Sequence, residues 1–261
     1  MPWTTCFYSY KGGTGRTALL ARIAQEMLKK EQRVCCVDFD IEAPGFEVFF
    51  NKNELSEYNL LPTFLNQTFT PLLNEIRTKE LAAISTKASE VNIRDIDDFQ
   101  DNFLYSTGAE EFKGAIYNFI GDVLNPSNFH VLLIDNRTGL TTRAENLFYF
   151  ANTIVFVFRP DLQNQMIIKE RLLSYFNYLM RDMPKLERIC VVLNLIPNFS
   201  DEATQKRLEQ FLSESGIQEA VGSKKLTLFK IPFFKEVYYN EREIFSVNNP
   251  VFEKIARFLL P

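Results

Sequence analysis

The amino-acid sequence predicts a doubly wound α/β fold, in which helices flank a mostly parallel sheet. Short segments such as Val131–Ile134 and Ile154–Phe158 are almost entirely apolar, which is typical of strands buried on both faces of a parallel sheet. Helix-like stretches alternate with these segments, as they do in chains that build right-handed crossovers. The first strand-like segment also leads directly into a glycine-rich turn and an amphipathic helix.

The expected elements follow one another along the whole chain. The strands are expected at Thr4–Ser9, Arg33–Phe39, Asn102–Ser106, His130–Asp135, Thr153–Arg159, Arg188–Asn194 and Leu226–Ile231. The helices are expected at Thr17–Glu31, Ala109–Leu124, Thr142–Ala151, Gln163–Met183, Ser200–Ser215 and Pro250–Leu260. The segment Leu55–Asp101 mixes polar and helix-like patterns, and we interpret it as a helical insertion. Because no repeat or linker interrupts the chain, residues 1–261 are expected to form one domain.

Composition restricts the classes of function. Apolar residues make up 46% of the chain, enough for a large core, and most of the 25 phenylalanines are expected to pack in it. The formal net charge of -4 argues against a nucleic acid as the partner. The four cysteines include no C-x-x-C pair and there is one histidine, which argues against a zinc site or an iron–sulfur cluster. His130 is expected in the core.

Three further features indicate a cytoplasmic protein. The cysteines are interpreted as buried, reduced thiols, and Cys35 and Cys36 should face opposite sides of a strand. No apolar run reaches the length of a membrane span, and the strand-like segment Trp3–Tyr10 follows the first residues directly.

The strongest motif follows the first expected strand and reads Lys11-Gly12-Gly13-Thr14-Gly15-Arg16-Thr17. Glycines allow successive backbone N–H groups to turn toward one anion, and the N-terminus of the following helix adds partial positive charge. Thr17 stands where its hydroxyl can bind Mg²⁺. The pattern therefore predicts a phosphate-binding loop, although Arg16 occupies the position that lysine takes in most such loops.

This motif resembles the deviant phosphate loop of the MinD/ParA ATPases, K-G-G-x-G-K-[ST], at every fixed position except Arg16. The resemblance implies ATP and Mg²⁺ as ligands. It assigns nucleotide binding to the loop and the residue after it, namely Gly12, Gly13, Thr14, Gly15, Arg16, Thr17 and Ala18.

Other segments resemble the same family in the same order. Asp38–Gly45 is similar to its switch I, which implies that Asp40 positions the attacking water and helps to hold the metal. Leu132–Gly139 is similar to its Walker B and switch II, which implies Mg²⁺ binding by Asp135 and γ-phosphate contact by Gly139. Asn194, Pro232 and Phe233 match the positions that contact the adenine base in the family.

The resemblance gives Lys11 and Arg16 different expected roles. The family's signature lysine, here Lys11, reaches the phosphates of the other subunit of an ATP-bound homodimer, so Lys11 is a candidate catalytic residue with Asp40 and Arg16. Arginine keeps the positive charge but is planar and binds bidentately, so Arg16 predicts slow hydrolysis.

Three functions remain open. The first is an ATP-dependent dimeric switch that recruits a partner protein, and the second is a nucleotide-binding scaffold without turnover in a multiprotein regulatory or bacterial defence complex. The third is a small-molecule ligase or kinase on the same fold. The final segment, Val251–Leu260, carries two basic residues and is expected to pack on the sheet rather than to bind a membrane. Lys224 and Lys225 form a small basic patch that DNA could contact, although the acidic balance of the chain argues against DNA binding.

Overall fold

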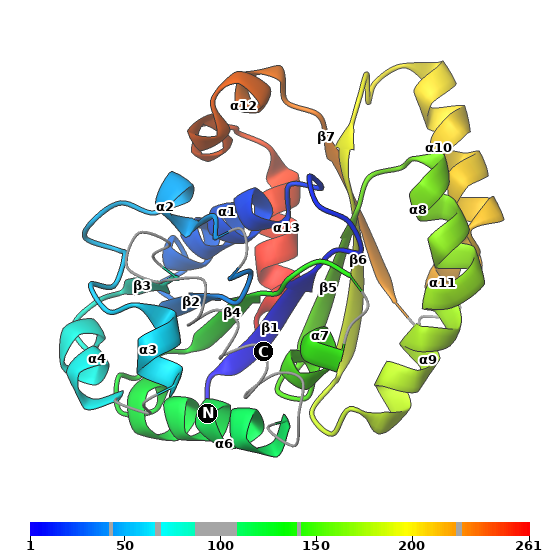
Figure 1. Cartoon of the computed structure of the whole chain (residues 1–261). Helices are drawn as coiled ribbons and strands as arrows, with labels where there is room; N and C mark the ends of the chain where they lie inside the picture. The colour runs from blue at the N-terminus through cyan, green and yellow to red at the C-terminus, as the bar shows by residue number, and fades with distance from the viewer. Residues whose placement is uncertain (42–43, 66–68, 87–108, 140–141, 223–225) are drawn as a thin grey trace.

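The computed structural model of the chain describes residues 1–41, 44–65, 69–86, 109–139, 142–222 and 226–261. Within these residues, seven parallel strands form one sheet in the order β3-β2-β4-β1-β5-β6-β7 (Figure 1). The strands are β1 (Trp3–Tyr8), β2 (Val34–Asp38), β3 (Leu81–Ile84), β4 (Val131–Asp135), β5 (Thr153–Phe158), β6 (Arg188–Ile196) and β7 (Thr227–Pro232). The predicted doubly wound α/β fold is therefore confirmed.

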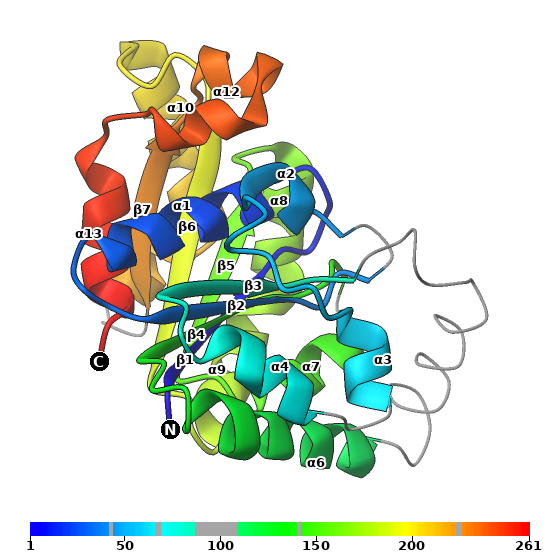
Figure 2. The same ribbon diagram turned by 90° about the vertical axis from the view of Figure 1, so that its left-hand side faces the viewer.

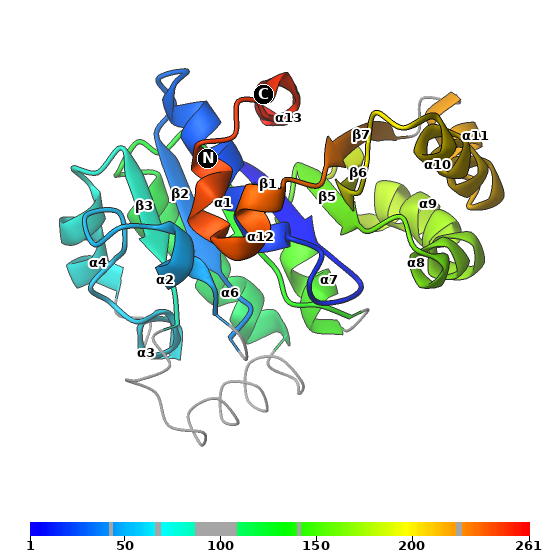
Figure 3. The same cartoon turned by 90° about the horizontal axis from the view of Figure 1, so that it is seen from above.

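Helices cover both faces of the sheet (Figures 1 and 3). Residues of α1 (Arg16–Leu28), α2 (Phe46–Phe49), the 3-10 turn η5 (Glu241–Phe245) and α13 (Pro250–Leu259) share one core cluster with the sheet. The second cluster takes in residues of α3 (Leu60–Leu65), α4 (Phe69–Ile76), α6 (Ala109–Phe119), η3 (Ile120–Leu124), α7 (Thr142–Phe148), α8 (Leu162–Ile167), η4 (Ile168–Leu172), α9 (Leu173–Asp182), α10 (Glu202–Glu214) and α11 (Ile217–Gly222). The helix α12 (Lys235–Tyr239) buries no residue and lies beyond the end of the sheet, at the top of Figure 1.

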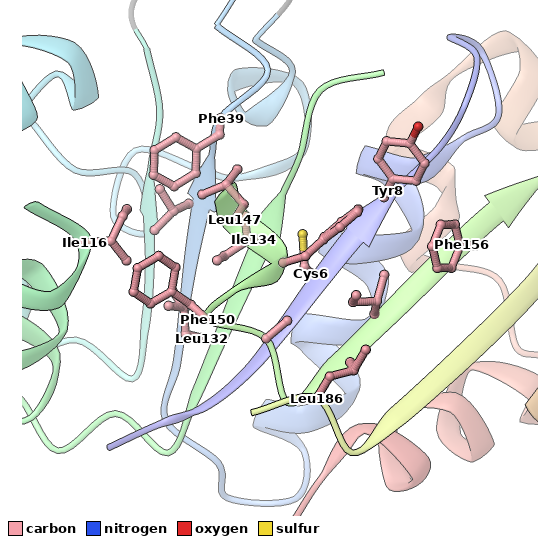
Figure 4. Close-up of a cluster of buried hydrophobic side chains, with 14 of the residues drawn as sticks. Cys6, Tyr8, Phe39, Ile116, Leu132, Ile134, Leu147, Phe150, Phe156 and Leu186 are labelled. Carbon is pink, nitrogen blue, oxygen red and sulfur yellow. The ribbon is translucent and has the colours of Figure 1, made fainter. Parts of the chain in front are cut away.

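The alternation of side chains along the strands divides the core into these two layers. Cys6 and Tyr8 enter the layer drawn in Figure 4, whereas Phe7 enters the other. Cys35 and Cys36 face opposite layers in the same way, as expected for neighbours in a strand. All four cysteines are buried and free, and burial raises the pKa of each thiol.

Several elements differ from those expected. Within the segment expected as a helical insertion, residues 55–65 and 69–86 hold α3, α4 and the edge strand β3, so this part extends the sheet. The remainder of that segment and the expected strand Asn102–Ser106 lie outside the described residues. His130 is exposed rather than in the core, because it lies one residue before β4 begins. The Nδ1 atom of His130 accepts a hydrogen bond from the backbone N–H of Arg33. The short elements α2, α11, α12 and η5 were not expected.

The last helix, α13, completes the layer of helices that contains α1. Phe252, Ile255, Ala256 and Leu259 of α13 are buried, and α13 packs along α1. No helix in the described part of the chain is long and apolar enough to cross a membrane.

The start of α13 offers a test of this packing. Asn249 caps the helix, because its side-chain oxygen accepts a hydrogen bond from the backbone N–H of Val251 at 3.0 Å. We expect Asn249→Ala to lower the free energy of unfolding by about 1 kcal/mol, since the capping bond is lost. Urea denaturation measures this change, and Asn249→Asp, which keeps the capping oxygen, is the control. An unchanged midpoint in Asn249→Ala would contradict the role of the cap.

Candidate nucleotide-binding site

The candidate site lies at the carboxyl end of the sheet, where three strands deliver their functional residues together. Strand β4 lies between β1 and β2, and its last residue, Asp135, is in register with Phe7 of β1 and Asp38 of β2. Strand β1 continues into the loop that precedes α1, and Figure 2 shows α2 and α12 at this same end of the sheet. In doubly wound sheets, ligands bind in the crevice at such strand ends.

The loop has the backbone of an anion-binding turn. Gly13 and Gly15 adopt φ values of 71° and 75°, in the left-handed region that favours glycine. Among the described residues, no protein group accepts a hydrogen bond from any backbone N–H between Lys11 and Ala18. The first N–H groups of α1 have no partner within the helix, and the unpaired N–H groups of the glycine-rich turn precede them. Together they offer a place for an anionic ligand.

Asn194 holds the conformation of the loop through a hydrogen bond. Its side-chain nitrogen donates a hydrogen bond to the backbone oxygen of Thr14 at 2.8 Å, and the residue is buried. A Cβ atom built on Gly15 would lie 2.7 Å from the same nitrogen. Glycine is therefore required at this position both by its backbone angle and by the close approach of Asn194.

Arg16 lies at the centre of a buried cluster of charges. Its Nη2 atom donates to Asp40 at 2.7 Å, its Nε atom donates to Asp135, and its Nη1 atom donates to the Ser9 hydroxyl at 3.3 Å. Only 6% of the Arg16 side chain is exposed. Burial alone would lower the pKa of Arg16, but the carboxylates of Asp135 and Asp40 raise it above its usual value. Arg16 therefore remains a cation whose donors bind protein carboxylates.

Asp38 shapes the segment 39–45, which follows β2. Its two carboxylate oxygens accept hydrogen bonds from the backbone N–H groups of Asp40 at 3.0 Å and Gly45 at 2.9 Å. Both bonds go to backbone N–H groups just beyond β2, so Asp38 holds the segment that carries Asp40. Burial raises the pKa of Asp38 well above its usual value, and the nearby charge of Asp135 raises it further. Glu42 and Ala43 of this segment lie outside the described residues.

Thr17 and Asp135 supply oxygen atoms beside the loop. The Thr17 hydroxyl donates to a carboxylate oxygen of Asp135 at 2.6 Å. Burial raises the pKa of Asp135, whereas Arg16 and Thr17 oppose this shift. The described residues hold no group of three or more His, Cys, Asp or Glu side chains that could bind a metal. A metal here would need the Thr17 hydroxyl and ligand oxygens as well as Asp135, and hard oxygen donors of this kind suit Mg²⁺.

Two cavities adjoin the loop. The first, of about 300 Å³, is lined by loop residues, Asp40, Val48, Phe49 and Thr138. The second, of about 350 Å³, is more apolar, and its lining includes Asn194, Leu195, Ile231, Phe233, Phe234 and Tyr238. Because one cavity offers backbone donors and the other aromatic rings, together they suit a ligand with an anionic end and a planar end.

Lys11 lies at the tip of the loop and is partly exposed. Its Nζ atom donates to the side-chain oxygen of Gln163 in the first turn of α8. Gly139, four residues after the end of β4, has a φ of 89°, which also favours glycine. Pro232 is the last residue of β7, where it pairs with Ile196, and it does not line either cavity, although Phe233 does.

The structure thus brings most predicted site residues to one edge of the sheet. Lys11, Asp40, Asp135, Asn194 and Phe233 come from separate segments and surround the loop. The sequence did not indicate Ser9, Gln163 or Glu241, which lines both cavities. No motif surrounds Glu241 or Gln163. Ser9 lies two residues before the loop, and its hydroxyl at that position was the one available signal.

Comparison with solved structures identifies the fold. The chain has the fold of the ParA and MinD ATPases. It resembles a ParA family ATPase from Chlorobium tepidum TLS with a TM-score of 0.68 and 14% sequence identity, covering 99% of each chain. It resembles the septum site-determining protein MinD complexed with Mg-ADP from Pyrococcus horikoshii OT3 with a TM-score of 0.65 and 14% identity, covering 99% of this chain and 96% of that one.

The same fold also occurs in an enzyme of different chemistry. Cobyrinic acid a,c-diamide synthase from Mycobacterium smegmatis, with bound ADP and magnesium, matches with a TM-score of 0.63 and 16% identity over 99% of this chain and 94% of that one. No protein-family model and no curated protein sequence matches the chain. Function must therefore be argued from the site.

Proposed function

We propose that this protein binds Mg·ATP, with the phosphates at the loop Lys11–Thr17 and the base in the apolar cavity beside Phe233. The observation that carries this proposal is the run of unpaired backbone N–H groups from Lys11 to Ala18, which includes the first residues of α1. The bound Mg-ADP of the Pyrococcus MinD structure and the bound ADP and magnesium of the Mycobacterium synthase support the same ligand class.

Thr17 and Asp135 are the residues that would hold Mg²⁺, since the Thr17 hydroxyl and the Asp135 carboxylate are adjacent. Neither group is hydrogen-bonded to a carbonyl or an amide among the described residues. The ion would supply positive charge to the phosphates. Asp135 lies next to Asp38 in the sheet register, so this edge has an excess of carboxylates over the single guanidinium of Arg16. A second cation fits that excess. Asp40 is held by Arg16 and would position water or support the metal from there.

The contacts of Arg16 support the expectation of slow hydrolysis. Its guanidinium is bound on three sides by Asp135, Asp40 and Ser9, so it differs from a mobile point charge placed among the phosphates. Three of its five N–H donors already bind these groups, so the guanidinium could move toward a transferring phosphoryl group only by breaking such bonds. We therefore infer a long-lived ATP-bound state. The alternative, a scaffold that binds ATP without turnover, rests on the same contacts, and no observation favours the ligase.

We further propose that ATP closes a homodimer that recruits a partner protein. Lys11 is at the exposed tip of the loop. There its Nζ atom can leave its hydrogen bond with Gln163 and contact the phosphates of the nucleotide bound to a second subunit. Large apolar side chains near the site are exposed on α8 and α12: Leu162 by 69%, Met166 by 52%, Tyr238 by 72% and Tyr239 by 75%. A second subunit placed over the site would bury such side chains.

Lys11→Ala tests the dimer and the turnover together. In the native protein we expect ATP to double the mass measured by light scattering and phosphate release to be slow. Lys11→Ala should release phosphate at least about 100 times more slowly, since a cation that stabilises phosphoryl transfer contributes at least this much. Lys206→Ala, which removes an exposed lysine on α10, is the control.

The outcomes distinguish the two functions. Turnover that Lys11→Ala abolishes supports the dimeric ATPase. ATP binding without turnover in the native protein, with turnover appearing in Arg16→Lys, supports the scaffold. A native protein that is monomeric with and without ATP would contradict the dimer.

A further inference from the structure

The two cavities of the site meet at a small group of residues. Gly13, Gly15, Ala18 and Glu241 line both cavities. Three of these residues have no functional group on the side chain, so Glu241 alone among them can recognise a ligand by its side chain. Its carboxylate makes no hydrogen bond or ion pair with the described residues.

The position of Glu241 is fixed by the turn that carries it. The Asn240 side-chain oxygen accepts a hydrogen bond from the backbone N–H of Arg242 at 3.2 Å and so caps η5. The Arg242 Nε atom donates to the backbone oxygen of Val48 in α2 at 2.6 Å, and Ile244 is buried against α1 and α13. Glu241 therefore extends from a turn that is attached on both sides of the cavity mouth, which reduces the entropy lost when its side chain binds a ligand.

The place where the cavities meet corresponds to one part of a nucleotide. If the phosphates bind at the loop and the base binds beside Phe233, as in the proposed function on which this inference rests, the sugar must cross the shared region. A ribose carries two adjacent hydroxyl groups, and an ionised carboxylate accepts hydrogen bonds through two oxygens. A carboxylate facing the phosphates themselves would repel them, so the sugar is the part of the ligand that Glu241 suits.

We propose that Glu241 binds the ribose hydroxyls and makes the site selective for ribonucleotides over 2′-deoxyribonucleotides. Loss of one hydroxyl leaves one carboxylate oxygen without its donor. Hydrogen bonds to charged groups are stronger than neutral ones, but Glu241 is exposed to solvent, so we expect about tenfold weaker binding of a deoxynucleotide.

The test measures dissociation constants of ATP, 2′-deoxyATP and 3′-deoxyATP by isothermal titration calorimetry in the presence of Mg²⁺. The native protein, Glu241→Ala and Glu241→Gln are compared with Glu236→Gln. This control removes a negative charge from the neighbouring helix α12, and Glu236 lines neither cavity. Thermal denaturation of each variant shows whether it remains folded.

The native protein and the control should bind ATP about ten times more tightly than either deoxynucleotide. Glu241→Ala should bind all three within about twofold of one another, mainly because its affinity for ATP falls. Equal binding of the three nucleotides by the native protein, or selectivity that survives Glu241→Ala, overturns this inference and leaves the proposed function intact. A folded native protein that binds none of them overturns both.

Discussion

Replacing Arg16 with alanine is expected to lower the free energy of unfolding at pH 8 by about 3–5 kcal/mol, the cost of removing one partner from a buried ion pair. The Arg16 side chain is 6% exposed and that of Asp135 is fully buried. Alanine leaves the Asp135 carboxylate beside Asp38 and Asp40 without its cation. The structure therefore makes Arg16 a stabilising residue of the fold as well as a residue of the site.

The loss should depend on pH in a defined direction. Burial already raises the pKa of Asp135, and removal of the guanidinium that opposes this shift would raise it further. The folded variant would then hold a proton that the unfolded chain releases above about pH 4. The difference in stability between variant and native protein should therefore be small near pH 4 and grow as the pH rises.

Urea denaturation of the native protein and Arg16→Ala at pH 5 and pH 8 measures both effects. Arg181→Ala is the control, since it removes an arginine from an exposed ion pair with Asp182. We expect no measurable change in that variant. An Arg16→Ala protein that is as stable as the native protein at pH 8 would show that the carboxylates do not depend on Arg16.

Gly15→Ala is expected to weaken nucleotide binding by about 100-fold or more, because the loop can no longer direct its N–H groups at the phosphates. A side chain at this position meets two obstacles, namely the φ of 75° and the Asn194 nitrogen, which would lie 2.7 Å from the new Cβ. Asn194 would have to give up its hydrogen bond to Thr14, and the loop would change shape.

Calorimetric titration with ATP measures this loss. The matched control is Gly114→Ala on α6, where a Cβ would have no neighbour within 4 Å and φ is not positive. We expect Gly114→Ala to bind ATP with native affinity. If Gly15→Ala bound ATP as tightly as the control, the loop would not be the phosphate site.

The sequence predicted the parts of the fold that depend on local patterns. Continuous apolar runs located six of the described strands to within one or two residues at each end. The strand β3 escaped prediction because Leu81–Ile84 has only four residues, two of them alanine, and it follows two helices. Propensity gives a weak signal for such a short edge strand, and its pairing with β2 determines its structure.

The site was predictable where residues belong to one continuous motif. The glycine-rich loop gave Lys11, Arg16 and Thr17, and the ends of apolar strands gave Asp38 and Asp135. The contacts of Arg16 were not predictable, because a motif gives the residue type but not which of several anions it binds. Glu241 was missed since it lies far along the chain from the loop, and only the folded chain places it at the site.

The most direct test of the central claim is a titration of the native protein with ATP, with Mg²⁺ and with EDTA, beside Thr17→Ala. We predict saturable binding with a dissociation constant below about 1 mM. Binding should be at least about tenfold tighter with Mg²⁺ than with EDTA, and Thr17→Ala should lose this difference because it lacks the hydroxyl that would hold the ion. A folded native protein that binds no ATP under either condition would contradict the claim.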